Sequence, residues 1–365
     1  MKPLGLGVLG LGEGRSIISA GLRSPLWRVV RLCDLNATLG RERCAEFGLD
    51  PACFTSSIDA MLADPAVDVV GVYTPDHLHA EHVLRILAAG KHVICTKPFL
   101  DRLDRAADVL AAVERSGRRV MVGQSSRFFA SFVRQREHFE SGALGELNSV
   151  EAYYNADHRW FLAKGWAKTD AFKWLYGGLS HPADFIRWYL PDVAEVMGYG
   201  RLSENGRRLG LVHDDTFHFI FRSASGRIAR VSGTYSAPVT PNARDSNMSC
   251  VLRGALGASQ ADYYDLRYAW KTDEQSAIET FEDQDEYFFR FGGHSHHAGE
   301  YQNYIEYFAR CLAEERQPLP DVREGIVTVA LLQAMEEATQ TGAAVKVRAV
   351  LARHGLEALA DERGA

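Results

Sequence analysis

The chain has 365 residues, of which 46% are hydrophobic and 24% charged, and its formal net charge is −6. This composition is that of an ordinary globular protein, and the length favours two domains over one. The acidic balance excludes the basic surface that nucleic-acid binding needs, and no apolar run approaches the roughly 20 residues of a membrane span. We therefore expect neither a nucleic acid nor a membrane as a partner.

The N-terminus and the cysteines favour a cytoplasmic location. Met1-Lys-Pro-Leu leads into glycines without the apolar core of a secretion signal. The cysteines have no paired spacing, so we expect reduced packing residues and no structural zinc site. They are Cys33, Cys44, Cys53, Cys95, Cys250 and Cys311.

The first 125 residues alternate between short apolar runs and amphipathic stretches. We expect strands at 4–9, 28–33, 67–73, 92–95 and 119–122, and helices at 36–47, 77–89 and 102–115. Strands separated by helices of this length predict right-handed βαβ crossovers and a parallel sheet. The first domain, 1–125, is therefore expected to be α/β with a doubly wound parallel sheet.

The alternation of apolar runs with amphipathic stretches ends after Gln124. We expect a helix at 131–140, strands at 149–154, 193–199, 216–222, 228–236 and 248–253, and helices at 300–312 and 323–340. Arg222-Ser-Ala-Ser-Gly-Arg227 is typical of a hairpin turn, and Gly342 is a stop signal for the last helix. The second domain, 126–350, is therefore expected to be α+β, with a mostly antiparallel open sheet flanked by helices.

A glycine-rich loop follows the first expected strand and precedes the first expected helix. It contains Gly10, Gly12 and Gly14, followed by Arg15. Glycines in this position allow a tight turn and a close backbone approach to a pyrophosphate, which the helix N-terminus then stabilises. The usual spacing is G-x-G-x-x-G, and here the third glycine arrives one residue early. Because the loop lies between a strand and a helix, we expect a dinucleotide-binding Rossmann domain.

An acidic residue ends the second expected strand. Asp34 lies 22 residues after Gly12, where a carboxylate accepts hydrogen bonds from the adenosine ribose and repels a 2′-phosphate. No arginine follows directly to hold such a phosphate. The sequence therefore predicts NAD in preference to NADP.

Several further motifs make the chain similar to a known family. Tyr73-Thr74-Pro75-Asp-His-Leu-His79 resembles T-P-N-x-x-H, and Ala89-Gly-Lys-His-Val with Thr96-Lys97-Pro98 resembles A-G-K-H-V…E-K-P. Both are motifs of the glucose–fructose oxidoreductase / inositol dehydrogenase (Gfo/Idh/MocA) family, and the resemblance covers nearly the whole chain. It implies that the cofactor is also contacted by Thr74, Pro75, His79, Lys97, Pro98 and Gln124.

The resemblance also implies a catalytic role for Lys97, which in this family lies beside the nicotinamide and contacts the substrate hydroxyl. A lysine at the carboxyl edge of a parallel strand faces the crevice where ligands bind. Partial burial lowers its pKa towards a value useful for proton transfer. Thr96 replaces the family's glutamate, so the charge partner of the lysine is left open.

The segment from Gly177 to Asp184 resembles the family's D-x-x-x-H-x-x-D helix, with His181 and Asp184 in the last two positions. The first acid falls on Gly177, so one usual member of the catalytic set is missing. Pro182 suits a first helical turn, so we expect the helix to start near His181. We expect His181 to be catalytic and Asp184 to contact substrate or orient the imidazole.

Three further residues are expected near the substrate. His158 and Trp160 follow a strand of the second sheet, and an exposed tryptophan can stack on a sugar ring. His296 belongs to the run His294-Ser-His296-His297, whose spacing lacks the i,i+4 pair and nearby acid of a metal site. We expect these residues to contact substrate and expect no metal.

These observations predict an oxidoreductase that transfers a hydride between NAD(P) and a secondary alcohol of a cyclic polyol, sugar or glycoside. Lys97 and His181 hold the hydroxyl, and which of them is the formal base stays open. Two alternatives are an NAD-dependent glycosidase that acts through a transient keto-sugar, and a non-catalytic NAD-binding sensor. The resemblance also implies a homodimer or homotetramer through the exposed face of the second sheet.

Overall fold

The computed structural model describes residues 2–162, 168–170, 172–238, 248–263, 265–281, 288–291 and 294–361, with only the backbone at 161–162, 288–291 and 294–298. The chain forms two compact units. The first comprises Met1–Phe128 and Gln284–Ile326, and the second comprises Phe129–Asp283 and Val327–Ala365. The expected division at residue 125 does not anticipate the return of Gln284–Ile326 to the first unit, because nothing in that segment's own pattern indicates which core it joins.

The first unit is built on a six-stranded parallel sheet in the order β3-β2-β1-β4-β5-β6. The strands are β1 (Leu4–Leu9), β2 (Trp27–Cys33), β3 (Phe54–Thr55), β4 (Val69–Val72), β5 (His92–Thr96) and β6 (Val120–Gly123). The helices are α1 (Arg15–Arg23), α2 (Ala37–Phe47), α3 (Ile58–Ala63), α4 (His79–Ala88), α5 (Ala106–Ser116) and α11 (Glu300–Ala313). Short 3-10 turns lie at η1 (Pro51–Cys53), η2 (Asp76–Leu78) and η3 (Ser125–Phe128), and β15 (Phe288–Phe291) pairs with β16 (His294–Ala298).

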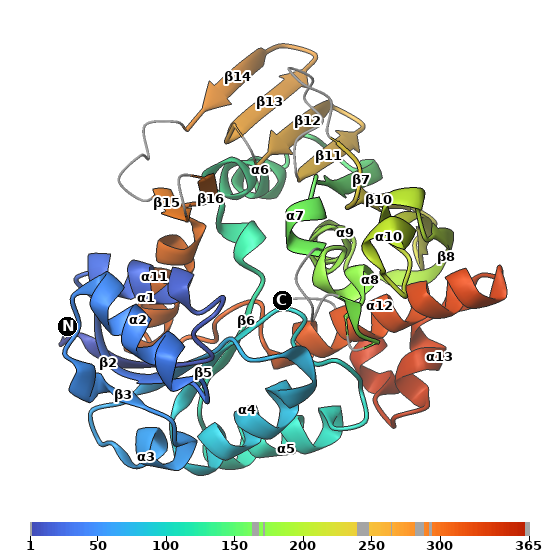
Figure 1. Cartoon of the computed structure of the whole chain (residues 1–365). Helices are drawn as coiled ribbons and strands as arrows, with labels where there is room; N and C mark the ends of the chain where they lie inside the picture. The colour runs from blue at the N-terminus through green and yellow to red at the C-terminus, as the bar shows by residue number, and fades with distance from the viewer. Residues whose placement is uncertain are drawn as a thin grey trace. The chain divides into compact units, whose positions relative to one another are not determined.

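Helices cover both faces of this sheet, with α1, α2 and α11 on one side and α3, α4 and α5 on the other (Figure 1). The order reverses between β1 and β4, so the carboxyl ends of these two strands border the crevice in which such sheets bind ligands. α11 completes the core next to α1, where the Trp27 indole Nε1 donates to the Ile305 carbonyl at 3.0 Å. The predicted doubly wound sheet is confirmed.

The second unit contains a nine-stranded sheet in the order β14-β13-β12-β11-β7-β10-β9-β8-β17. The strands are β7 (Leu147–Asn155), β8 (Val193–Arg201), β9 (Thr216–Ser223), β10 (Ile228–Thr234), β11 (Ser249–Gly254), β12 (Gly257–Asp262), β13 (Arg267–Thr272), β14 (Ser276–Thr280) and β17 (Val345–Lys346). The helices are α6 (Ala130–Glu140), α7 (Arg159–Leu162), α8 (Trp174–Gly177), α9 (Ser180–Tyr189), α10 (Glu204–Leu209) and α13 (Val347–Ala352), with a final 3-10 turn, η6 (Glu357–Ala360). α12 (Val322–Thr341) begins in the first unit and continues into the second after Ile326.

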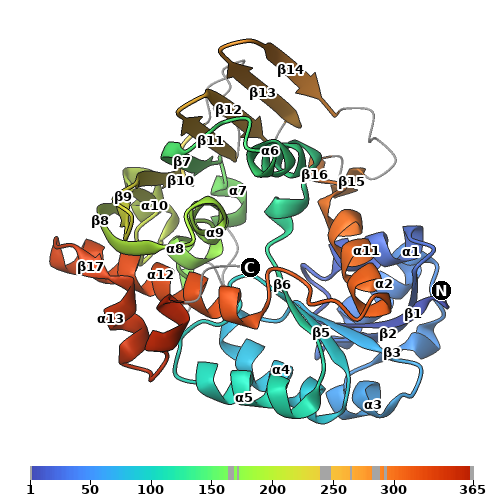
Figure 2. The same ribbon diagram turned by 180° about the vertical axis from the view of Figure 1, so that it is seen from behind.

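The pairing within this sheet is antiparallel except between β7 and β10. Figure 2 shows α6 and α9 against one face of the sheet. Alternation along β9 sends Phe217, Phe219 and Phe221 to that covered face and leaves His218 and Ile220 on the other. The predicted mostly antiparallel sheet with flanking helices is confirmed, as is the hairpin between β9 and β10, where Gly226 has a φ of +87°.

Candidate functional site

The glycine loop connects the carboxyl end of β1 to α1. Gly10 has a φ of +87°, and a Cβ atom on it would lie 2.6 Å from the Tyr73 carbonyl carbon. A Cβ on Gly14 would lie 2.2 Å from the Gly10 carbonyl oxygen. These two positions therefore require glycine for local packing. At Gly12 no atom lies within 4 Å of the Cβ position, so the backbone is open to the close approach of a pyrophosphate.

Two polar atoms near this edge are buried and make no hydrogen bond to the described part of the protein. They are the Ser16 hydroxyl in the first turn of α1 and the Gln124 side-chain oxygen after β6. Buried polar groups are normally satisfied, so the Ser16 hydroxyl can donate to or accept from a ligand, and the Gln124 oxygen can accept from one. The open loop, the N-terminus of α1 and these two groups fit a dinucleotide, and sequence reasoning missed Ser16 because a serine in a first helical turn carries no distinguishing signal.

Asp34 follows β2, and both of its carboxylate oxygens face the backbone of neighbouring loops. Oδ2 accepts from the Leu11 N–H at 2.8 Å and Oδ1 accepts from the Asn36 N–H at 2.8 Å. Arg43 on α2 reaches the same loop, where its Nε donates to the Leu11 carbonyl at 3.0 Å. No sequence motif predicts this cation, because Arg43 is distant along the chain and reaches the loop through the packing of α2. Arg15, the first residue of α1, forms an ion pair with Glu46, and a contact of its side chain with the cofactor phosphates stays a prediction.

The loops after β4 and β5 are joined by His79. Its ring is fully buried, with Nδ1 2.9 Å from the Pro98 carbonyl oxygen and Nε2 2.9 Å from the Thr74 carbonyl oxygen. The Thr74 hydroxyl lies 2.9 Å from Nδ1 of His82. The imidazole therefore links the two predicted cofactor loops, and a direct contact of His79 with the cofactor stays a prediction.

Lys97 follows the last residue of β5 and is partly buried. Burial lowers the pKa of its ammonium group, and the carboxylates of Asp76 and Glu13 partly oppose this effect. The Lys97–Pro98 peptide bond is cis. Thr96 leaves no acid directly before the lysine, and Asp76, in the turn after Thr74-Pro75, is the carboxylate with the larger electrostatic effect on Lys97. Neither Asp76 nor Glu13 is expected from the sequence to act on Lys97.

In the second unit, α9 starts at Ser180, so Pro182 lies in its first turn and the predicted start near His181 is confirmed. The side chains of His181 and Asp184 are both buried. A Cβ atom on Gly177 would lie 3.2 Å from the ring of Phe172. The position where the family motif has its first acid is therefore next to an aromatic ring.

An aromatic cluster lies at the carboxyl ends of β7 and β10. The Trp174 and Tyr235 rings stack at 4.4 Å, and His158 stacks on Trp174 at 5.1 Å. Tyr154 connects this cluster to His181, with ring centroids 6.2 Å apart. Trp160, on α7, is 57% exposed and meets the His158 ring edge-on. His158, Trp160 and His181 therefore belong to one region of the second unit, whereas the side chain of His296 lies outside the described residues.

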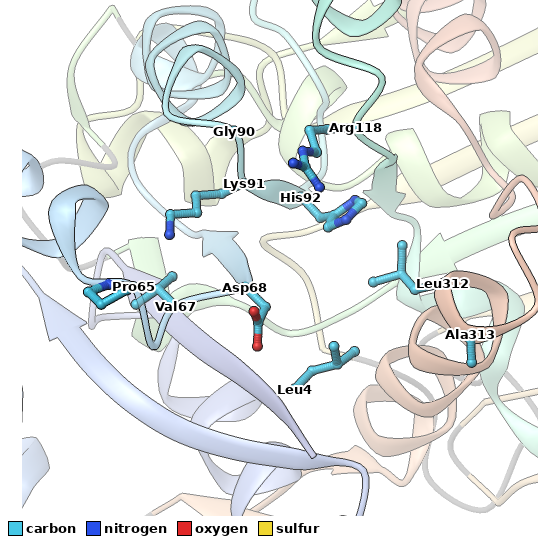
Figure 3. Close-up of a pocket in the computed structure, with 10 residues that line it drawn as sticks. All are labelled: Leu4, Pro65, Val67, Asp68, Gly90, Lys91, His92, Arg118, Leu312 and Ala313. Carbon is cyan, nitrogen blue, oxygen red and sulfur yellow. The ribbon is translucent and has the colours of Figure 1, made fainter. Parts of the chain in front are cut away.

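A separate cavity of about 370 Å³ lies at the amino ends of the parallel strands, at the opposite edge of the first sheet from the glycine loop (Figure 3). Three of its polar side chains already have partners within the fold. Lys91 donates to the Asp64 carbonyl, Asp68 accepts from the Gly5 N–H, and Nδ1 of His92 accepts from the Arg119 N–H. This cavity contains none of the predicted site residues.

Among the described side chains, no group of three or more histidines, cysteines or acids could hold a metal ion, and the run His294–His297 is outside that set. No helix in the described ranges is long and apolar enough to cross a membrane. All six cysteines are described, and none forms a disulfide.

The parallel sheet, its glycine loop and the aspartate that follows β2 define a dinucleotide-binding protein. The second unit is also built from helices and strands and contains buried histidine and acid side chains. Residues 4–124 match the model of an oxidoreductase family with an NAD-binding Rossmann fold, and residues 136–347 match that family's C-terminal alpha/beta domain. The chain belongs to the Gfo/Idh/MocA oxidoreductase family. This confirms the predicted family, oxidoreductase class and NAD cofactor.

Individual relatives are distant. A levoglucosan dehydrogenase of Pseudarthrobacter phenanthrenivorans is 24% identical over 75% of this chain and 78% of its own. An inositol 2-dehydrogenase of Saccharopolyspora erythraea is 27% identical over 70% of this chain and 71% of its own. An oxidoreductase from Agrobacterium radiobacter, solved with NAD+, L-tartaric acid and magnesium, has a TM-score of 0.82 and 18% identity, and covers 95% of this chain and 99% of its own.

Proposed function

We propose that this protein is an NAD-dependent dehydrogenase that oxidises a secondary alcohol of a cyclic polyol, sugar or glycoside. The observation that carries the proposal is Lys97, a partly buried lysine with a lowered pKa at the carboxyl edge of the dinucleotide-binding sheet. Dehydrogenases named for levoglucosan and inositol among the relatives support this substrate class.

The chemistry requires a group that holds the hydroxyl and a group that takes its proton. Bound NAD supplies the hydride acceptor. An amine with a lowered pKa is neutral in a larger fraction of molecules at neutral pH, so Lys97 can accept the hydroxyl proton and return it in the reverse direction. His181 is the proposed second group on the same hydroxyl. It lies in the first turn of α9, where a neutral imidazole is favoured and can exchange one proton.

The remaining predicted contacts enter the proposal with separate roles. Asp184 orients His181 or contacts the substrate, since both side chains belong to the first turns of α9. Trp160 offers an exposed aromatic ring to a sugar, and the His158 ring meets it edge-on. Asp34 selects NAD through the adenosine ribose, and Gln124 offers its buried amide oxygen to the cofactor.

The test compares Lys97→Ala and Lys97→Arg with the wild-type protein. We expect both variants to bind NAD in calorimetry, because most of the dinucleotide contacts remain. Turnover should fall by roughly 10²–10⁴-fold, the usual contribution of general acid–base catalysis. The assay is NADH formation over a panel of inositols, sugars and glycosides, which includes levoglucosan. Lys97→Arg is the matched control for charge, because arginine keeps a cation but cannot give up its proton.

Three outcomes of this assay have different meanings. Undiminished turnover in a folded, NAD-binding Lys97→Ala protein rejects the proposed role. Release of aglycone without NADH accumulation would instead indicate a glycosidase that regenerates its cofactor. Tight NAD binding without turnover on any compound would favour a sensor, an alternative that the Phe172 ring beside Gly177 keeps open.

We also propose that the protein assembles as a homodimer or homotetramer through the second sheet. The face opposite α6 and α9 carries exposed apolar side chains on adjacent strands. Met197 on β8 is directly opposite Ile220 on β9, and Tyr199 is opposite His218. An exposed apolar patch on an open sheet is a typical protein interface.

A further inference from the structure

His79 presents both ring nitrogens to hydrogen-bond acceptors. Its side chain has 0% exposure, so water does not reach the imidazole. Nδ1 lies 2.9 Å from the carbonyl oxygen of Pro98, and Nε2 lies 2.9 Å from the carbonyl oxygen of Thr74. A backbone carbonyl oxygen can only accept a hydrogen bond, so each nitrogen must donate.

A neutral imidazole cannot satisfy this geometry. It has one N–H and one bare nitrogen, so in either tautomer one nitrogen lone pair would face a carbonyl lone pair at 2.9 Å. A doubly protonated ring makes two charge-assisted bonds instead. We propose that His79 is an imidazolium at neutral pH that clamps the Thr74-Pro75 loop to the Lys97-Pro98 loop, with Asp76 as its counter-charge.

A buried cation needs a compensating charge, and Asp76 supplies it from the turn that leads into α4. Burial raises the pKa of the Asp76 carboxyl, and the charges of His79 and Lys97 oppose this effect and favour the carboxylate. Burial by itself lowers the pKa of His79, but Cys95, Asp76 and the Thr74 carbonyl raise it, and the pKa reaches about 10. The Cys95 thiol lies 3.8 Å from the Phe99 carbonyl oxygen, to which it can donate. Other titratable groups on the surrounding elements are Glu13, His77, His82 and Asp101.

The register of the sheet explains why a link between these two loops affects Lys97. Val72 of β4 is paired with Cys95 of β5, so the chain reaches Thr74 and Lys97 two residues later on both strands. Bonds from one rigid ring to carbonyl groups on both sides fix the backbone that carries the amine. His79 is therefore a positioning residue for Lys97, and this role, unlike the protonation state, rests on the function proposed above.

The protonation state can be read directly from the ring nitrogens. In the full-length protein labelled with ¹⁵N-histidine, the resonances of His79 are assigned by their loss in His79→Gln. At pH 7.5 we expect both nitrogens to show the chemical shift of a protonated nitrogen, and we expect no titration between pH 6 and 8.5. A signal from one unprotonated nitrogen at pH 7.5 overturns the proposal, whether or not the protein binds NAD or turns over any substrate.

The counter-charge is tested with Asp76→Asn against Glu81→Gln, a matched change at an exposed acid on α4. In Asp76→Asn we expect His79 to lose its proton at lower pH than in wild type, with no such change in Glu81→Gln. Equal titration of His79 in wild type and both variants removes Asp76 from the proposal. This comparison does not require His79→Gln to fold. The His79 resonances can also be assigned by replacing the other histidines, so that their signals are removed and the His79 signals remain.

Stability provides a second readout with a defined sign. The pKa of His79 is raised from 6.5 to about 10, so the unfolded chain loses this proton at lower pH than the folded protein. The stabilisation is complete below pH 6.5 and is lost as pH rises towards 10. We expect unfolding midpoints in urea to fall over this range in wild type and to fall less steeply in His79→Gln. The same slope in both proteins contradicts a charged His79.

Discussion

At the residue scale, Asp34 and Arg43 place opposite charges at the same loop. Asp34 accepts from the Leu11 N–H, and Arg43 donates to the carbonyl group of the same residue. The carboxylate repels a 2′-phosphate, whereas the guanidinium could bind one. The sequence predicted the acid from its distance after the glycine loop. It could not predict the arginine, because the reach of a side chain on α2 depends on how that helix packs.

This pair makes cofactor choice a testable property. In Asp34→Asn we expect NAD to bind roughly 10–100-fold more weakly, because hydrogen bonds to a charged group contribute about 1.5–3 kcal/mol. NADP should bind more tightly than in wild type, since the repulsive charge is gone and Arg43 remains. Calorimetric titration with both cofactors measures the ratio, and Arg43→Ala in the Asp34→Asn background should abolish the gain for NADP.

Asp50→Asn is the control for this experiment, because Asp50 caps the short turn η1 through the Ala52 N–H and leaves the glycine loop unchanged. An unchanged preference for NAD over NADP in Asp34→Asn would show that the Asp34 carboxylate does not distinguish the ribose hydroxyl of NAD from the 2′-phosphate of NADP.

At the scale of elements, the junction between α8 and α9 sets the position of His181. The sequence predicted the start of α9 from Pro182, which is compatible only with a first turn. It did not reveal why two glycines precede the helix. The structure gives the reason for the second, since a Cβ atom on Gly178 would lie 2.4 Å from Cζ of Tyr235. The aromatic stack of Tyr235 on Trp174 leaves little room for the ring to move.

We therefore expect Gly178→Ala to destabilise the second unit by about 1–3 kcal/mol, the usual cost of overpacking. Gly177→Ala should cost less, because its Cβ would be 3.2 Å from the edge of the Phe172 ring. Urea unfolding followed by tryptophan fluorescence measures both. In the Tyr235→Leu background the cost of Gly178→Ala should shrink, and equal costs in both backgrounds would mean that the ring is not the obstacle.

At the scale of the whole molecule, the second sheet has one face under helices and one face open. Strand alternation in β8 and β9 was visible in the sequence, and so was the presence of apolar residues on both sides of these strands. The sequence did not show which face of the sheet is open, because the alternation of side chains does not tell which side the helices cover. The structure assigns the exposed positions, among them Tyr199 at 66% and Ile220 at 59% exposure.

If this face joins protomers, Ile220→Glu should reduce the molar mass measured by sedimentation equilibrium towards that of a single chain. A charge placed in an apolar interface loses its hydration without gaining a partner. Leu22→Glu, a change at an exposed leucine on α1, should leave the mass unchanged. A wild-type protein that is already a single chain at micromolar concentration would reject the assembly.

The sequence by itself determined the elements and the class of chemistry. Periodicity predicted most strands and helices within a few residues, and the glycine loop, Asp34 and the lysine motif predicted an NAD-binding oxidoreductase. These signals are local, because turn geometry, helix termini and side-chain alternation depend on neighbouring residues. The strands from β12 to β16 escaped notice because their short, mixed runs lack that local pattern.

Only the tertiary structure determined which residues that are far apart in the sequence lie close together in space. It brought α11 into the first unit, Arg43 to the glycine loop, Asp76 to the electrostatic field of Lys97, and the ring of His79 between two carbonyl groups. Burial and long-range contacts set these properties, and neither is encoded in the residues adjacent to them. The charge of a histidine and the partner of a lysine therefore depend on packing that no local motif specifies.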